Sequence, residues 1–209
     1  MEDTPDAALP GAATQVLDYW LGDALQLGWP SQSRHVLWFG GDRAQDDAIT
    51  QQFGPWVEQA LAGGLTHWEA TPMGCLALVI VLDQFTRNVF RGQGRAFSGD
   101  ARARLLVRDT LQRGWDTQLP CAGAVFLYMP LMHAEDLALQ EESVRRFQNL
   151  LAGAAPEHKQ DLQGNVKFAI EHRDIIGRFG RFPYRNRVLG RPSSADELVF
   201  LQDGPRFGQ

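Results

Sequence analysis

The chain has 209 residues, of which 44% are hydrophobic and 22% charged, and its formal net charge at pH 7 is −5. This length suits a single domain with a proper core, which we expect to span residues 1–209 with a flexible N-terminus over residues 1–13. The longest purely apolar run, residues 75–82, is far shorter than the roughly 18 residues that a membrane span needs, and the acidic composition argues against nonspecific binding to nucleic acid or membranes.

Two features bear on the cellular compartment. Residues 1–14 contain three acidic residues and lack the basic stretch and apolar run of a signal peptide. Cys75 and Cys121 both lie in apolar segments, which is typical of buried free thiols in a reducing compartment. We therefore expect a cytoplasmic protein without disulfide bonds.

Helical periodicity dominates the first third of the chain. Residues 16–21 begin an amphipathic segment, whereas residues 22–41 contain several glycines and are expected to be mostly loop. Asp42 is placed to cap a helix with a clear apolar face, which ends at the glycines 63–64.

Two further helices are expected in the middle of the chain. Thr71 followed by Pro72 is typical of an N-cap with a first-turn proline, and it predicts a helix that runs through Leu82. This helix is apolar on all sides and should therefore be central in the fold. Residues 98–100 begin another helix, which Gly114 closes.

Two prolines shape the next prediction. Pro120 and Pro130 bracket a short apolar helix over residues 124–129. We expect the following helix to begin near His133 and to carry an apolar stripe as far as Leu151.

The last elements are also helical, and they complete the prediction of fold class. A long helix is expected from near Pro156 to Phe179, and the capping box formed by Ser194 and Glu197 predicts a short terminal helix. No segment alternates like a strand. The fold class is therefore all-α, about seven to nine helices arranged as antiparallel hairpins, either tetratricopeptide-like or as an irregular bundle.

Arginines gather near the C-terminus. Residues 173–191 contain six arginines and a single acid, Asp174, and residues 84–91 have a weaker Arg/Asn/aromatic composition of the same kind. Such a segment attracts anions, and guanidinium groups bind carboxylate or phosphate bidentately. The alternative is an elaborate helix termination, because asparagine and arginine both suit helix C-termini. The candidate ligand-binding residues are Arg87, Arg178, Arg181, Arg185 and Asn186.

Three residues are candidates for acid–base chemistry. His133 and His172 both fall on apolar helix faces, where a hydrogen-bonded core histidine is the competing interpretation. Glu135 is two residues from His133, which on a helix separates the two side chains by roughly 200° and prevents them from sharing a metal. No HExxH or CxxC signature is present, and we predict neither a metal nor another cofactor.

Asp83 and Arg87 lie four residues apart at the end of the most apolar helix and are expected to enter the interior as a pair. One interpretation is a structural salt bridge. The other is that Arg87 joins the C-terminal arginines around an anionic ligand, with Asp83 orienting it and His133 or His172 serving as general acid or base.

Four segments resemble a bacterial family known as domain of unknown function 924. They are residues 16–20, 82–92, 128–136 and 177–191, and together they extend over nearly the whole chain. The sequence departs from the family pattern at Thr86, where a proline is usual, and at Tyr184, where a histidine is usual. The resemblance implies an all-helical, tetratricopeptide-like fold and no established activity.

Three interpretations of the whole set stay open. The first is a pocket for a small anionic ligand, binding or enzymatic, formed by the convergence of the candidate residues above. The second is a tetratricopeptide-like module that binds a peptide, such as one with an acidic C-terminus that the same arginines contact. The third is an arginine-rich cover pinned by salt bridges to Asp83 and Glu135. The sequence predicts no oligomeric state.

Overall fold

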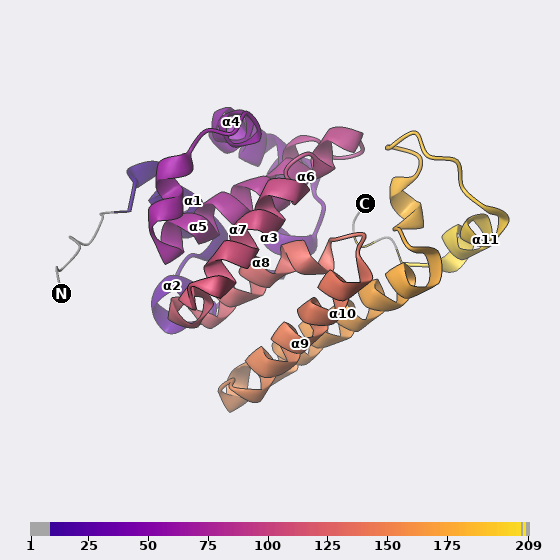
Figure 1. The fold of residues 1–209 in the computed structure, drawn as a ribbon. Helices are drawn as coiled ribbons and strands as arrows, with labels where there is room; N and C mark the ends of the chain where they lie inside the picture. Colours follow the sequence, from indigo (N-terminus) through magenta and orange to yellow (C-terminus); the bar gives the residue numbers. More distant parts are fainter. Residues whose placement is uncertain (1–8, 206, 208–209) are drawn as a thin grey trace.

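The computed structural model describes residues 9–205 and residue 207, and its regular elements are helices throughout this part of the chain (Figure 1). The longer helices are α1 (Gly11–Leu21), α4 (Arg43–Leu61), α5 (Pro72–Ile80), α7 (Asp100–Gln112), α8 (Cys121–Met132), α9 (Leu137–Ala152), α10 (Lys159–Phe179) and α11 (Ala195–Asp203). The shorter ones are α2 (Ala24–Leu27), α3 (His35–Phe39) and α6 (Thr86–Val89). The predicted all-α class is thus confirmed.

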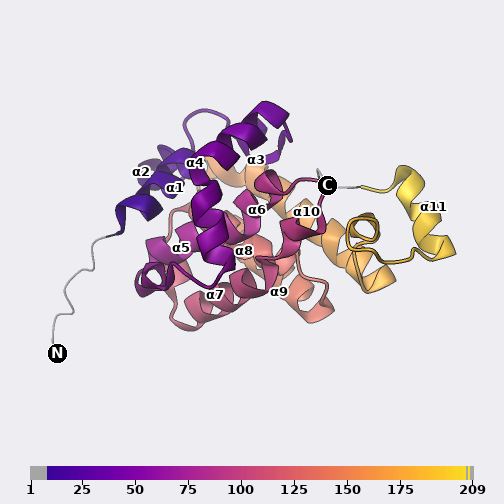
Figure 2. The ribbon, with the colours of Figure 1, turned by 90° about the horizontal axis from the view of Figure 1, so that it is seen from above.

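Helices α5 and α8 form the centre of the fold. Every residue of α5 from Gly74 onward is buried, and so is every residue of α8 after Cys121. Helix α5 packs against α1, α7 and α8, while α8 also packs against α9. Helix α8 lies near the middle in both views of the ribbon (Figure 1, Figure 2). Apolar residues on all sides of these two helices explain their position, because neither could face water.

The N-cap predicted for α5 is present, but the helix changes its geometry earlier than expected. Thr71 accepts a hydrogen bond from the Gly74 N–H at 3.1 Å, and Pro72 occupies the first turn. The α-helical part ends at Ile80, where a π-helical turn, η2 (Val81–Phe85), leads directly into α6. Such wide turns are frequent at functional sites because they redirect side chains.

The prediction that Pro130 ends the preceding helix was wrong. Helix α8 contains Pro130 in its last turn and continues to Met132, so that His133 is its C-cap. Only one helical hydrogen bond is lost by a proline this close to a helix end. The next helix, α9, begins after Asp136, whose carboxylate accepts a hydrogen bond from the Leu139 N–H at 3.1 Å. His133 therefore does not start α9, as the sequence had suggested.

Other predicted boundaries are confirmed. Asp42 caps α4 through the Ala44 N–H, and the capping box of Ser194 and Glu197 opens α11. The stretch 22–41 contains the short helices α2 and α3 in addition to loop. Of the N-terminal segment expected to be flexible, residues 1–8 lie outside the described residues, and α1 begins at Gly11.

Helices α9 and α10 form a long antiparallel hairpin along one side of the molecule (Figure 1). Gly180, with φ of +68°, ends α10 in the left-handed conformation that glycine adopts without strain. The chain then turns through η6 (Pro183–Arg185) to α11 at one end of the molecule (Figure 1). A tetratricopeptide-like stacking of further hairpins stays a prediction. None of the described helices is both long and apolar enough to cross a membrane.

Candidate functional site

A cavity of about 310 Å³ lies where α3, the η2–α6 turn, α8, α10 and η6 meet. We call it the arginine compartment. Its polar lining residues are His35, Gln84, Arg87, Asn88, Arg91, His133, Asn165, His172, Tyr184 and Arg185. Its apolar wall includes Trp38, Met129, Met132 and Phe168. Segments more than 90 residues apart in the sequence thus contribute to one space.

A carboxylate–histidine pair lies at the bottom of this compartment. The π-helical turn brings Asp83 beneath the C-cap of α8, where its two carboxylate oxygens are 2.8 and 3.0 Å from Nδ1 of His133. Asp83 is fully buried. Burial alone would raise the pKa of its carboxyl, but the charge of Arg87 and the hydrogen bonds from His133 outweigh burial and hold that pKa below its ordinary value. Asp83 is therefore a permanent anion at neutral pH.

His133 is held neutral in a defined orientation. Burial lowers the pKa of His133, and the opposing charge of Asp83 does not restore it. A neutral imidazole whose Nδ1–H donates to a carboxylate has an unprotonated Nε2, which is a hydrogen-bond acceptor. His133 thus combines the orientation and the protonation state of a general base.

Two buried arginines lie beside this pair and share one aspartate. Nη2 of Arg87 is 3.1 Å from Oδ1 of Asp100, and Nη1 is 3.3 Å from Oδ1 of Asp83. Nη1 of Arg185 is 3.6 Å from Oδ2 of Asp100. Arg87 therefore has two carboxylate partners, whereas Arg185 has only a long contact to a carboxylate that it shares.

Arg185 is the less satisfied of the two arginines. It is 5% exposed, and its guanidinium lies 4.5 Å from the ring centroids of Phe97 and Phe182. Its Nε has no hydrogen-bond partner in the part of the chain that the structure describes. Burial lowers the pKa of Arg185 more than its carboxylate neighbours raise it. A buried guanidinium with an unused N–H donor is a site at which an anion would be stabilised.

His172 and Tyr184 are neutral at physiological pH. Nδ1 of His172 is 2.7 Å from the Phe168 carbonyl oxygen, its ring stacks on Phe207 at 3.8 Å, and burial lowers its pKa to about 3. The ring centroids of His133 and His172 are 6.1 Å apart. Burial raises the pKa of Tyr184 to about 12, so this residue offers a hydroxyl and no charge where the resemblance had suggested a histidine.

The eight residues singled out in the sequence do not all converge. Arg87, Arg185, His133 and His172 line the arginine compartment, whereas the other four have partners in the C-terminal segment. Glu135 accepts hydrogen bonds from Arg191 at 2.6 and 2.9 Å and from the Phe182 N–H at 2.8 Å.

The remaining three residues do not line the arginine compartment, and one of them, Asn186, is buried elsewhere. Arg181 forms a bidentate pair with Glu197, at 2.6 and 2.8 Å. Asn186 is hydrogen-bonded to Ser193 and Arg191, at 3.0 Å each. Arg178 lies over the ring of Phe179, with 4.6 Å between the guanidinium carbon and the ring centroid. Such contacts are typical of residues that hold the C-terminal segment against the end of α10.

Sequence reasoning missed several lining residues. Arg91 forms an ion pair with Asp46 at 2.5 Å, and Asn88 donates to the same carboxylate at 2.8 Å. Asp46 precedes this segment by more than 40 residues and lies on α4, so no local pattern could indicate the pairing. Trp38 lies in a stretch expected to be loop, and no sequence pattern indicated that it lines the cavity.

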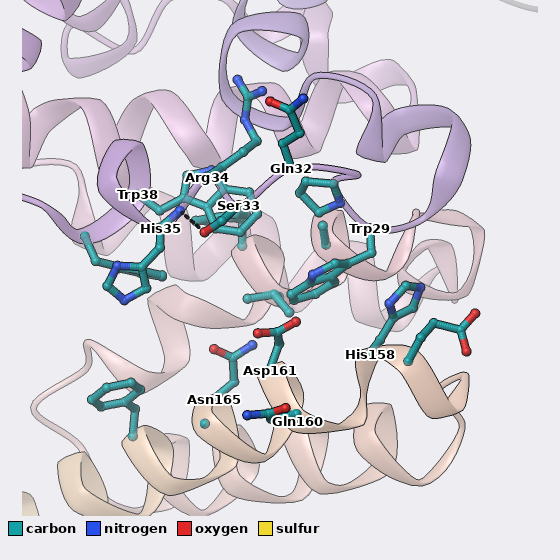
Figure 3. Close-up of a pocket in the computed structure, with 18 residues that line it drawn as sticks. Trp29, Gln32, Ser33, Arg34, His35, Trp38, His158, Gln160, Asp161 and Asn165 are labelled. Atoms are coloured by element: carbon teal, nitrogen blue, oxygen red, sulfur yellow. Dashed lines mark hydrogen bonds between the residues drawn. The ribbon is translucent and has the colours of Figure 1, made fainter.

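A second and larger cavity adjoins the first. It has a volume of about 590 Å³ and lies between residues 29–39, α8 and the N-terminal half of α10 (Figure 3). We call it the tryptophan compartment, after Trp29 and Trp38. The two compartments have five lining residues in common, His35, Trp38, Phe39, Asn165 and Phe168. They are therefore consecutive parts of one cleft.

The chemistry of the donor groups fits an organic anion better than a metal ion. Within residues 9–205 and 207, no three His, Cys, Asp or Glu side chains gather closely enough to hold a metal. The arginine compartment instead offers one incompletely paired guanidinium and one oriented proton acceptor.

Comparison with known proteins identifies relatives without a described activity. Residues 16–205 match the family model described as a bacterial protein of unknown function (DUF924). No curated protein matches the chain. A solved structure titled as a protein of unknown function, ATU0120, from Agrobacterium tumefaciens is 33% identical, with a TM-score of 0.76 over 92% of this chain and 97% of that one. A family match of this extent means that the chain belongs to the DUF924 family of bacterial proteins.

Proposed function

We propose that the arginine compartment binds a small anionic ligand, a carboxylate or a phosphate, through Arg185. The observation that carries the proposal is the buried Arg185 guanidinium. Its Nε has no hydrogen-bond partner among the described residues, and the carboxylate beside it, Asp100, is shared with Arg87. A buried charged donor without a hydrogen-bond partner destabilises the folded protein. An anion in the cavity that accepts this hydrogen bond would remove the destabilisation.

The neighbouring dyad gives the site a chemical capacity beyond binding. Nε2 of His133, oriented by Asp83, would accept a proton from a ligand held by Arg185. A binding module without catalysis, the alternative, would use the same arginine and leave the dyad as a buried hydrogen bond. Both forms of the proposal make anion binding depend on Arg185.

A thermal-shift titration tests the proposal. We expect phosphate, acetate or succinate to raise the unfolding midpoint of the wild-type protein at constant ionic strength, because a ligand that binds only the folded state stabilises it. Arg185→Gln should remove this increase. The matched control is Arg178→Gln, because Arg178 lies outside the cavity and should leave the increase intact.

The comparison between the two variants decides the outcome. An increase that survives in Arg185→Gln, or that disappears equally in both variants, would contradict the proposal. If Arg185→Gln is too unstable to titrate, His133 provides a second measurement. Its imidazole resonances in the wild-type protein should shift on anion addition, and unchanged resonances would count against binding in this cavity.

A further inference from the structure

The two compartments together have the shape and the charge distribution of a site for a short peptide with free ends. We propose that the cleft binds an unblocked peptide of about five residues, with its C-terminal carboxylate at Arg185 and its N-terminal ammonium group at Asp161 and Glu157. This inference rests on the proposed function, because it identifies the anion as a peptide carboxylate.

Two helices set the length of the cleft. On α8, Ala122 lines the far end of the tryptophan compartment and His133 lines the arginine compartment. On α10, the corresponding pair is Asp161 and His172. Each pair is 11 residues apart, which at 1.5 Å per residue gives a cleft about 16 Å long. An extended chain spans at most about 3.3–3.6 Å per residue, so about five residues fit.

The two ends of the cleft differ in charge. Of the two compartments, Glu157 and Asp161 line the tryptophan one and not the other, whereas Arg87, Arg91 and Arg185 line the arginine one and not the other. In Figure 3, Asp161 and Asn165 project from α10 toward Trp29 across the cavity. A ligand that matches this polarity carries a cation at one end and an anion at the other.

The two basic side chains that line the acidic end, Arg34 and His158, have other contacts. The Arg34 guanidinium, which also lines the tryptophan compartment, donates to the backbone carbonyls of Trp20 at 3.1 Å and Tyr19 at 2.5 Å. His158 stacks on Trp29, with 5.7 Å between ring centroids. Neither contact is made with Asp161.

The charge balance at the other end favours a carboxylate over a phosphate. Three arginines of the arginine compartment, Arg87, Arg91 and Arg185, are matched by three aspartates behind them, Asp46, Asp83 and Asp100. Their charges sum to zero, so an anion would be bound by the guanidinium donors that face the cavity, and the second charge of a dianion would have no cation to match it. A monoanion needs only the Nε–H of Arg185, which has no partner within residues 9–205 and 207, and a peptide terminus supplies such a monoanion.

The walls between the ends suit a peptide backbone. Gln32 and Asn165 line one compartment and Gln84 and Asn88 the other, with Asn165 common to both. Side-chain amides have both donors and acceptors, as peptide groups do. Trp38 and Phe168 offer apolar surface to the side chains of the occupant.

Calorimetric titration with the pentapeptide Ala-Ala-Phe-Ala-Ala tests the inference, with N-acetylated and C-amidated forms for comparison. Amidation should weaken binding tenfold or more, because a hydrogen bond from a buried charged donor is lost. Acetylation should weaken it about two- to fivefold, because the acidic end is exposed and screened by water.

Two variants test which residue binds each terminus of the peptide. In Asp161→Asn the free and acetylated peptides should differ less in affinity than in the wild type, with Glu157 accounting for the remaining difference. Arg185→Gln should bind the free and amidated peptides with nearly equal affinity. The matched control for Asp161 is Asp174→Asn, since Asp174 is also an exposed aspartate of α10, paired with Arg173 outside the cleft. It should behave as the wild type does.

The results separate the two proposals. If acetylation weakens binding to Asp161→Asn as much as to the wild type, the peptide orientation is wrong. If the pentapeptide binds no more tightly than acetate while acetate still depends on Arg185, the peptide inference fails and the proposed anion site stands. If neither ligand depends on Arg185, both fail.

Discussion

The two histidines of the arginine compartment have different partners and therefore different properties. His133 has a carboxylate on Nδ1, so a proton on Nε2 would be stabilised by Asp83. His172 has only the Phe168 carbonyl oxygen on Nδ1 and an aromatic ring against its face. The surroundings of His133 thus favour exchange of a proton at Nε2, whereas the surroundings of His172 hold it neutral.

Protonation of His172 should destabilise the folded state. Burial disfavours the charged imidazolium and lowers the pKa of His172 from 6.5 to about 3. Between these two values the unfolded chain binds a proton at His172 that the folded chain does not bind. Stability contributed by neutral His172 is present above pH 6.5 and is lost as the pH falls toward 3. From pH 7 to pH 5 this loss is about 2 kcal/mol.

Urea unfolding at the two pH values measures this loss. His172→Gln should reduce the difference in unfolding free energy between pH 7 and pH 5 by about 2 kcal/mol relative to the wild type. His67→Gln is the control, because His67 is exposed. Equal pH dependence in the wild type and His172→Gln would show that His172 is not buried in its neutral form.

At the level of helices, the geometry of the site depends on one close approach. The first turn of α7 lies against the π-helical turn η2, which places Asp100 between Arg87 and Arg185. Gly99 permits this approach, since a Cβ built at this position would lie 2.2 Å from the Leu82 carbonyl oxygen. The absence of a side chain at one residue therefore positions the aspartate that two arginines share.

Gly99→Ala should displace the start of α7 and weaken the ion pairs of Asp100. We expect a loss of about 1–3 kcal/mol in unfolding free energy, typical of overpacking against backbone that cannot move freely. Denaturant unfolding measures the change. Gly164→Ala is the matched control, because nothing lies within 4 Å of its added Cβ and alanine favours the interior of α10. A Gly99→Ala protein as stable as the wild type would refute this account.

The elements that the sequence predicted well are those determined by local chemistry. Asp42, Thr71 and Ser194 each cap the helix expected of them, because a capping side chain acts within three residues. Pro130 misled the prediction, because the packing of the buried helix α8 outweighs the helix-breaking tendency of a single proline. The π-helical turn that positions Asp83 was also missed, because no residue in Val81–Phe85 is typical of such a turn.

For the molecule as a whole, the site depends on contacts between distant parts of the sequence. Spacing predicted that Asp83 and Arg87 would pair, and they do. The sequence could not show that Asp100 joins them, that Glu135 turns away toward Arg191, or that residues 29–41 cover the cavity. Each of these depends on how packed helices are placed relative to one another.

The segment over the cleft is attached to α1. Arg34 donates to the carbonyls of Tyr19 and Trp20, and the Trp38 indole donates to the Trp20 carbonyl at 2.8 Å. Arg34→Ala should loosen this attachment and increase amide hydrogen exchange in residues 29–41 while exchange in α5 and α8 stays unchanged. Arg43→Ala, an exposed arginine at the start of α4, serves as control. Unchanged exchange over residues 29–41 would mean that other contacts hold the segment.

Helix α8 has two roles that cannot be separated by substitution. Its residues from Ala122 to Met132 belong to the hydrophobic core, and the same helix provides the floor of both compartments and ends at His133. A change in a side chain such as Met129 would therefore alter the packing of the core and the shape of the cleft at once. Under the proposal that the cleft binds a ligand, substitutions along this floor would change ligand preference only as far as the stability of the fold permits.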